Sequence, residues 1–150
     1  MPLCFVSVGS NIDPEKNVRA ALQALHAQFG PLLISSIRET EAVGFQGAPF
    51  LNLAVGIFTE HPPQRTATVL ANIERTQGRV RADERFGSRT LDLDLLLYGE
   101  LCDPNLKIPR PEIAEHAFVL EPLAEIAPAL QHPQLERTMG QLWDSFKLGR

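Results

Sequence analysis

Two aspartates separated by one leucine are the strongest chemical signal in this sequence. Strand periodicity over residues 90–96 predicts that Asp92 and Asp94 share one face while the neighbouring leucines occupy the other. Their Cα atoms would lie roughly 7 Å apart, so the carboxylates repel each other unless a cation lies between them. Carboxylates without an accompanying His or Cys favour Mg²⁺ or Mn²⁺. The plainer alternative is an exposed polar strand face.

A group of arginines lies immediately upstream of this pair. Guanidinium forks fit phosphate oxygens, and beside a magnesium-binding aspartate pair they favour transfer of a phosphate-containing group from a nucleotide to a small acceptor. The alternative is a solvated charge run, partly neutralised by acidic neighbours. Arg79 and Arg89 are the better phosphate-binding candidates, whereas the alternative is serious for Arg75, Arg81 and Arg85.

Composition and missing motifs exclude several other classes of protein. A net charge of −4 gives no general attraction to nucleic acid or anionic membranes, so we expect neither as a partner. The sequence has no P-loop motif and no Gly-x-Ser-x-Gly motif. Cys4 and Cys102 have no metal-type spacing and indicate structural thiols. No apolar run has membrane-spanning length and the first residues lack a secretory pattern, so we expect a cytoplasmic location.

The elements that must position these residues follow from hydrophobic periodicity. Helical spacing over residues 14–29 is bounded by Asp13 as an expected N-cap and by Gly30 as a stop. Strand, helix, strand, strand, helix, strand is the order of the split βαβ plan. We therefore expect one α+β domain over residues 1–150, with a ferredoxin-like, mostly antiparallel sheet, helices on one face and weaker helical segments at the C-terminus. The expected strands are Leu3–Val8, Leu32–Arg38, Leu51–Thr59 and Leu91–Tyr98, and the helices are Pro14–Phe29 and Gln64–Gln77.

A twelve-residue segment resembles the signature of the 6-hydroxymethyl-7,8-dihydropterin pyrophosphokinases, the enzymes of folate synthesis. It runs from Arg85 to Leu96 and reads Arg-Phe-Gly-Ser-Arg-Thr-Leu-Asp-Leu-Asp-Leu-Leu. The resemblance covers nearly the whole chain and also implies the ferredoxin-like fold. Further matching segments are Val8-Gly9-Ser10-Asn11, Phe50-Leu51-Asn52, Gln77-Gly78-Arg79-Val80-Arg81, Phe118-Val119-Leu120 and Glu125-Ile126-Ala127-Pro128.

This resemblance implies transfer of pyrophosphate from ATP to the hydroxymethyl group of the pterin, with release of AMP. It implies two Mg²⁺ ions held by Asp92 and Asp94, and in-line attack of the substrate hydroxyl on the β-phosphorus without a covalent enzyme intermediate. We expect small-molecule partners and a monomer or weak homodimer.

The resemblance also assigns site residues. Catalytic roles fall to Arg79, Arg89, Asp92 and Asp94. Two phenylalanines would sandwich the flat pterin while an asparagine bonds its edge, although ordinary core is the plainer reading of such phenylalanines. The expected pterin residues are Thr40, Val43, Phe50, Asn52 and Phe118, and the expected ATP residues are Glu74, Arg79, Arg81, Phe86, Arg89, Lys107, Arg110 and His116.

Four positions depart from the family pattern. Arg110 stands where the family usually has His within Pro-His-Pro, and His116 stands where it usually has Arg. Ala82 occupies an often basic position, and Phe86 replaces the usual Trp. These changes keep two alternatives open, a paralogue that uses another pterin or nucleotide, and a non-catalytic pterin-binding module. We further expect the loops 43–49 and 81–89 to move when substrates bind.

Overall fold

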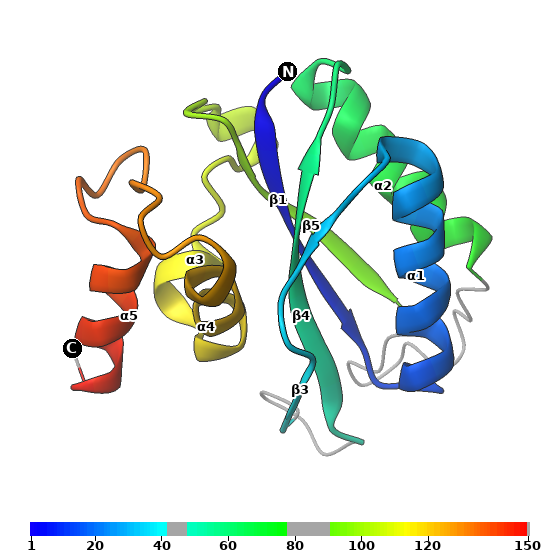
Figure 1. Cartoon of the computed structure of the whole chain (residues 1–150), viewed down its shortest axis with the longest axis horizontal. Helices are drawn as coiled ribbons and strands as arrows, with labels where there is room; N and C mark the ends of the chain where they lie inside the picture. Colours follow the sequence, from blue (N-terminus) through cyan, green and yellow to red (C-terminus); the bar gives the residue numbers. More distant parts are fainter. Residues whose placement is uncertain (42–47, 78–90, 150) are drawn as a thin grey trace.

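The computed structural model describes residues 1–41, 48–77 and 91–149, in which a five-stranded sheet carries helices on both faces (Figure 1). Its path is β2-β4-β1-β5, with β3 also paired to β4, and each pair is antiparallel. This is the order that the split βαβ plan requires, so the predicted ferredoxin-like α+β fold is confirmed. The strands are β1 Leu3–Ser10, β2 Leu33–Ile34, β3 Arg38–Thr40, β4 Phe50–Phe58 and β5 Asp92–Tyr98.

Two long helices lie where periodicity predicts them. Helix α1 spans Pro14–Phe29 as expected and ends at Gly30, whose φ of 79° suits glycine. Helix α2 spans Pro63–Thr76, one residue earlier at each end than expected. Asp13 takes the N-cap position as expected, but its backbone is left-handed and its side chain makes no cap hydrogen bond.

The single strand expected over Leu32–Arg38 is wrong, because the structure divides it into β2 and β3. Ser35 accounts for the break. Its hydroxyl accepts a hydrogen bond from the N–H of Ala54 at 2.8 Å, replacing a backbone carbonyl in the ladder. The next N–H, from Ser36, donates to the carboxylate of Glu125 instead of to a strand. Two polar side chains therefore interrupt the pairing with β4.

The two faces of the sheet bury separate clusters of apolar side chains. On one face, Val8 and Leu95 pack with Val18 of α1 and Leu70 of α2. On the other face, the C-terminal helices cover a second cluster, which includes Phe5, Ala54, Leu97 and Leu123. The expectation of helices on one face is therefore wrong, because an apolar C-terminal helix buries the second face (Figure 1).

The C-terminal part of the chain is helical, as expected. A 3₁₀ turn at Pro104–Leu106 leads to the short α3 (Glu112–Glu115) and to α4 (Ala117–Ile126), and α5 follows at Met139–Lys147. Thr138 and Gln141 form a capping box at the start of α5. Within the described stretches, no helix has both the length and the apolar character needed to cross a membrane.

Both cysteines are free thiols, as the sequence indicates. Cys4 is buried in β1, and Cys102 is exposed after β5. Burial raises the pKa of the Cys4 thiol to about 11, although a hydrogen bond with the backbone of Gly99 partly opposes the rise. Cys4 is therefore an inert part of the core.

Candidate active site

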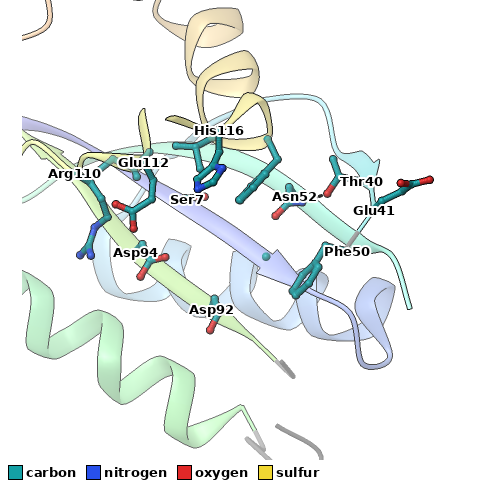
Figure 2. A pocket seen from close by; sticks show the side chains of 14 residues that line it. Ser7, Thr40, Glu41, Phe50, Asn52, Asp92, Asp94, Arg110, Glu112 and His116 are labelled. Atoms are coloured by element: carbon teal, nitrogen blue, oxygen red, sulfur yellow. Dashed lines mark hydrogen bonds between the residues drawn. The ribbon is translucent and has the colours of Figure 1, made fainter. Parts of the chain in front are cut away.

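A pocket of about 380 Å³ opens on the sheet face that the C-terminal helices only partly cover. We call it the main pocket. Figure 2 shows side chains entering it from β3, β4 and β5 and from the segment around α3 and α4. It joins residues predicted for three different roles: Thr40, Phe50, Asn52 and Phe118 for the pterin, Asp92 and Asp94 for metal, and Arg110 and His116 for ATP.

Strand β5 presents both aspartates to the main pocket. Leu93 and Leu95 are buried against α1 and α2, whereas Asp92 and Asp94 lie on the opposite face and point into the pocket (Figure 2). The predicted alternation is therefore confirmed. The pairing of β1 with β5 shifts register between Phe5 and Val6, so that consecutive residues Leu96 and Leu97 both join the second core. At this shift in register, β5 changes from lining the main pocket to packing in the second core.

The surroundings of Asp94 disfavour its charged form. Desolvation by nearby protein atoms raises the pKa of this carboxyl, the charge of Arg110 lowers it, and the charge of Glu112 raises it. The net direction is upward although part of the side chain remains open to solvent. In Figure 2 the carboxylate of Glu112 turns toward Asp94. Acidic groups gathered in this way favour a bound cation.

Backbone contacts hold Arg110 beside β5. Its N–H donates to the carbonyl of Leu96 at 3.0 Å, and its Nε donates to the carbonyl of Leu95 at 3.2 Å. The guanidinium also lines a second cavity of about 90 Å³ on the other side of β5, together with Glu74, Leu95 and Leu106. Arg110 thus belongs to the walls of both cavities.

Glu74 touches the aspartate segment from the α2 side. Its Oε2 accepts a hydrogen bond of 2.7 Å from the backbone N–H of Leu93, the residue between Asp92 and Asp94. Among the described strands, β5 lies at the edge of the sheet. The N–H of Leu93 that faces away from β1 is therefore bonded by a helix side chain instead of by another strand. Glu74 therefore links α2 to the aspartate segment.

Aromatic and amide side chains form the other end of the main pocket. Phe50 and Phe118 are half-buried, and Asn52 is buried with its Nδ2 donating a hydrogen bond to the hydroxyl of Thr40 (Figure 2). The ring of His116 stacks on Phe118 with centroids 4.9 Å apart and an interplanar angle of 21°. Both phenylalanines line a cavity and are not fully buried core.

One row of paired residues connects the two ends of the pocket. Asn52 of β4 and Asp92 of β5 both pair with Gly9 of β1, from opposite sides. At one strand spacing per step, their backbones are about 10 Å apart. A Cβ on Gly9 would lie 2.9 Å from Oδ1 of Asn52. The missing side chain at Gly9 therefore leaves the space between amide and carboxylate open.

Several predicted site residues lie outside the described parts of the chain: Val43, Arg79, Arg81, Phe86 and Arg89. Nearly all of the two loops predicted to move lies there as well. Lys107 is described, but it is exposed and lines neither cavity, although its neighbour Leu106 lines the second one. Arg75 bonds the side chain of Asn72 on its own helix, which fits the solvated-charge alternative.

Sequence reasoning missed some residues of the pocket wall. Ser7 and Gly9 share the pocket face of β1, and strand alternation from Gly9 could have identified Ser7. Glu41 and Glu112 each follow a predicted site residue by one or two positions, but no pattern in the sequence distinguishes them from solvated carboxylates. Their place in the wall depends on tertiary structure.

The donor set of the pocket suits magnesium. Among the described residues, no cluster of three or more His, Cys, Asp and Glu side chains could form a closed metal cage. Two aspartates on one strand face supply hard oxygen donors, and magnesium is commonly bound by one or two carboxylates with substrate phosphates completing its shell. The residues present therefore fit a metal that binds together with a polyphosphate.

Comparisons of the sequence with known proteins all find the same family. Residues 5–128 match the family described as 7,8-dihydro-6-hydroxymethylpterin-pyrophosphokinase. A relative from Pseudomonas aeruginosa named 2-amino-4-hydroxy-6-hydroxymethyldihydropteridine pyrophosphokinase is 40% identical over 135 residues, which cover 86% of this chain and 83% of the relative. A relative of the same name from Bacillus subtilis is 40% identical over 130 residues, covering 83% and 77%.

Solved structures support the fold. A crystal structure of HPPK-DHPS from Plasmodium falciparum aligns with a TM-score of 0.74 at 13% sequence identity. The alignment covers 97% of this chain but only 44% of the other, so this chain spans less than half of that protein. At such low identity the likeness concerns the fold alone.

Proposed function

The chain belongs to the 7,8-dihydro-6-hydroxymethylpterin-pyrophosphokinase family, and from this premise we propose that the main pocket is the place where its two substrates meet. As a member, the chain is an ATP-dependent enzyme that transfers pyrophosphate to hydroxymethyldihydropterin in folate biosynthesis. The observation that carries the proposal is the presence of the aromatic pair and the aspartate pair in one pocket.

The pterin binds at the end formed by β3, β4 and α4. Phe50 and Phe118 offer flat apolar surfaces for the bicyclic ring, and the amide of Asn52 offers polar atoms for its edge. Thr40 bonds that amide and so limits its rotation. A few well-placed polar groups within an apolar wall are typical of small-molecule sites.

The nucleotide phosphates bind at the β5 end. Asp92 and Asp94 would hold two Mg²⁺ ions, which, when bound, neutralise charge on the phosphate oxygens. Arg110 lies between the main pocket and the second cavity and can donate to a phosphate while its Nε stays on Leu95. We assign the second cavity to another part of the nucleotide. Arg79, Arg81, Phe86, Arg89, Lys107 and His116 remain predicted ATP residues, although His116 stacks on Phe118 at the pterin end and Lys107 lines neither cavity.

The open space over Gly9 suits the reacting atoms. Gly9 lies on β1, between Asn52 on the neighbouring strand β4 and Asp92 on the neighbouring strand β5. The hydroxymethyl oxygen forms a bond to the β-phosphorus and its proton passes to solvent. The bond from that phosphorus to the oxygen bridging to the α-phosphate breaks, and AMP leaves with that oxygen. The chain's own contribution is to hold the acceptor in line and to place positive charge beside the phosphates.

We propose that residues 1–150 form a single domain and that the enzyme works in the cytoplasm as a monomer or weak homodimer. Continuous apolar clusters on both faces of a single sheet support one domain. Substrates that enter and leave a pocket built within one chain require no partner subunit. Light scattering after gel filtration measures the oligomeric state directly.

An assay of AMP release tests the proposed reaction. With ATP, 6-hydroxymethyl-7,8-dihydropterin and Mg²⁺, AMP should form in equal amount to pyrophosphorylated pterin, and chelation of divalent ions should abolish turnover. The same assay with GTP tests the alternative of a drifted nucleotide site, for which Arg110, His116 and Ala82 are the motivation. Absence of turnover at saturating ATP, pterin and Mg²⁺ would contradict the proposal.

A further inference from the structure

A network of charged and polar groups joins the segment before the pterin pocket to helix α4. Nη2 of Arg38 lies 2.8 Å from Oε1 of Glu125, and its Nε lies 3.5 Å from Oε1 of Glu121. Ser36 adds its N–H, at 3.0 and 3.1 Å from the two carboxylate oxygens of Glu125, and its hydroxyl, at 2.9 Å. We call Ser36, Arg38, Glu121 and Glu125 the clamp.

One end of the clamp lies on the strand that carries Thr40. Arg38 pairs with Asn52 and Thr40 pairs with Phe50 in the ladder between β3 and β4. Strand alternation places Arg38 and Thr40 on the same face of β3. A movement of this strand therefore moves Thr40 and changes the hydrogen bond that orients Asn52.

The other end lies on the helix that carries Phe118. Glu121 and Glu125 follow Phe118 by three and seven residues, so the three side chains form one stripe along α4. The same helix face thus supplies an aromatic wall to the main pocket and two carboxylates to Arg38. The clamp connects the two walls between which the pterin binds.

Among the described residues, strand β3 is held by few other contacts. It contains three residues, and among the described residues its only strand partner is β4. So short a pairing is weak without further contacts. Four donor contacts from Ser36 and Arg38 converge on the single carboxylate of Glu125 and supply such contacts.

We infer that the clamp is a positioning device that sets the separation between the Thr40–Asn52 pair and Phe118, and thereby the affinity for the pterin. The inference rests on the proposed pterin site. Arg38, Ser36 and Glu125 touch no substrate in this assignment, because none of them lines the main pocket. They act through the residues that do.

An ordinary surface ion pair is the competing explanation. The side chains of Arg38, Glu121 and Glu125 are 27%, 40% and 34% exposed, and pairs this exposed commonly add little stability. The two explanations differ in what they change. A surface pair affects stability slightly and kinetics not at all, whereas a positioning device changes KM for one substrate.

Steady-state kinetics of Arg38→Met, with each substrate varied in turn, separates them. Loss of the guanidinium should raise the pterin KM about fivefold. This effect is smaller than the roughly 100-fold loss that a misplaced group can cause. The ATP KM and kcat should stay within twofold of wild type. Arg38→Lys should recover part of the loss, because an ammonium keeps the charge but lacks the planar fork through which Nε and Nη2 face different carboxylates.

The carboxylate side gives an independent test. Glu125→Gln keeps an acceptor for Ser36 but removes the charge that faces Arg38, so we expect a smaller rise in pterin KM than for Arg38→Met. Combining both substitutions should add little beyond Arg38→Met alone, since residues of one network are not additive.

Lys147→Met provides a matched control, because it removes another cation from an exposed pair, with Asp144 at 3.5 Å, on helix α5. It should leave both KM values unchanged. An unchanged pterin KM in Arg38→Met, or an equal rise in the ATP KM, overturns the clamp. Wild-type turnover is measured in the same series, so failure of the proposed reaction would be seen separately.

Discussion

The two ends of the main pocket are held in place by different means. At the β5 end, the aspartates alternate with leucines that are buried in the core, and Glu74 fixes the backbone between them. At the pterin end, a three-residue strand and the start of a helix face each other, joined by partly exposed polar groups. The charged end is built into the core, whereas the pterin end joins the central strand β4 to two peripheral elements, β3 and the start of α4.

This difference has a consequence for how each end responds to change. Residues anchored by buried leucines keep their position when one polar atom is replaced, so such a substitution removes chemistry and leaves geometry. Residues placed by surface contacts shift when a contact is lost, so the substitution alters fit. Substitutions at the β5 end should therefore lower kcat, whereas those at the pterin end should raise the pterin KM.

The largest effect should come from the aspartate pair. Asp94→Asn keeps the shape of the side chain but removes one of the two charges proposed to hold the metal, so kcat should fall about 1,000-fold, in the range found when a transition-state contact is removed. Asp92→Asn should behave alike. Thermal unfolding should show no loss of stability in either variant, because the leucines that anchor β5 are unchanged.

Kinetics across a range of Mg²⁺ concentrations check this prediction. Full activity of either amide variant at ordinary Mg²⁺ would show that the pair holds no essential metal. A rise in the pterin KM with normal kcat would instead break the proposed division between the two ends.

Gly9→Ala should have the next largest effect and should act on the pterin end. The added Cβ would lie 2.9 Å from Oδ1 of Asn52, so the amide must turn away from Thr40 or from the ligand. We expect the pterin KM to rise about tenfold, since a misplaced binding group costs at least this much. Ser7→Ala, two residues away on the same pocket face, is the matched control.

A Gly9→Ala enzyme with a normal pterin KM would show that Asn52 does not orient the ligand. Equal rises in both KM values would indicate that the added methyl group blocks the space between the ends. Titration with a non-hydrolysable ATP analogue distinguishes these outcomes.

Glu74 tests whether backbone position matters at the β5 end. Glu74→Ala leaves the outward N–H of Leu93 without its side-chain acceptor, so the aspartate segment should loosen and kcat should fall about fivefold. Glu74→Gln retains a carbonyl acceptor and should recover most of this loss. If both variants raise only the ATP KM, and equally, Glu74 acts through its charge on the nucleotide and not through Leu93.

How far the sequence predicts this site depends on the range of the contacts involved. Alternation within Leu91–Leu95 is a local property, and it placed the aspartates on the correct face. Element order is also readable along the chain, which is why the ferredoxin-like plan was found. Both predictions, of strand alternation and of element order, are correct because each depends on residues that are close together in the sequence.

The features that sequence reasoning missed depend on partners far away in the chain. Strand pairing stops after β2 because Ser35 bonds Ala54 and Ser36 bonds Glu125, a residue 89 positions later. The residues around Ser36 in the sequence do not predict its contact with Glu125. Glu112 enters the pocket wall for a similar reason, since packing of the C-terminal segment on the sheet places it there.

His132 gives the smallest expected effect and tests whether a site distant from both ends is neutral for kinetics. It is buried in the segment that connects α4 to α5, and its Nδ1 accepts hydrogen bonds of 3.1 Å from the N–H groups of Gln134 and Leu135. Burial lowers the pKa of this imidazole. The folded protein therefore takes up a proton at His132 only at lower pH than the unfolded chain, whose ordinary pKa is about 6.5.

Stability contributed by neutral His132 is consequently present above about pH 6.5 and is lost as the pH falls below it. His132→Asn replaces Nδ1 by an amide oxygen that accepts the same N–H groups but does not titrate, at a cost of about 1 kcal/mol near neutral pH. Wild type should lose more thermal stability than His132→Asn between pH 7.5 and 5.5, and since all other histidines are common to both proteins, the difference isolates this residue. Both KM values and kcat at pH 7.5 should match wild type, because His132 lines neither the main pocket nor the second cavity. A kinetic change in this variant would mean that the C-terminal helices transmit strain to the pocket, and the separation of the molecule into a core-anchored end and a peripherally assembled end would then be too simple.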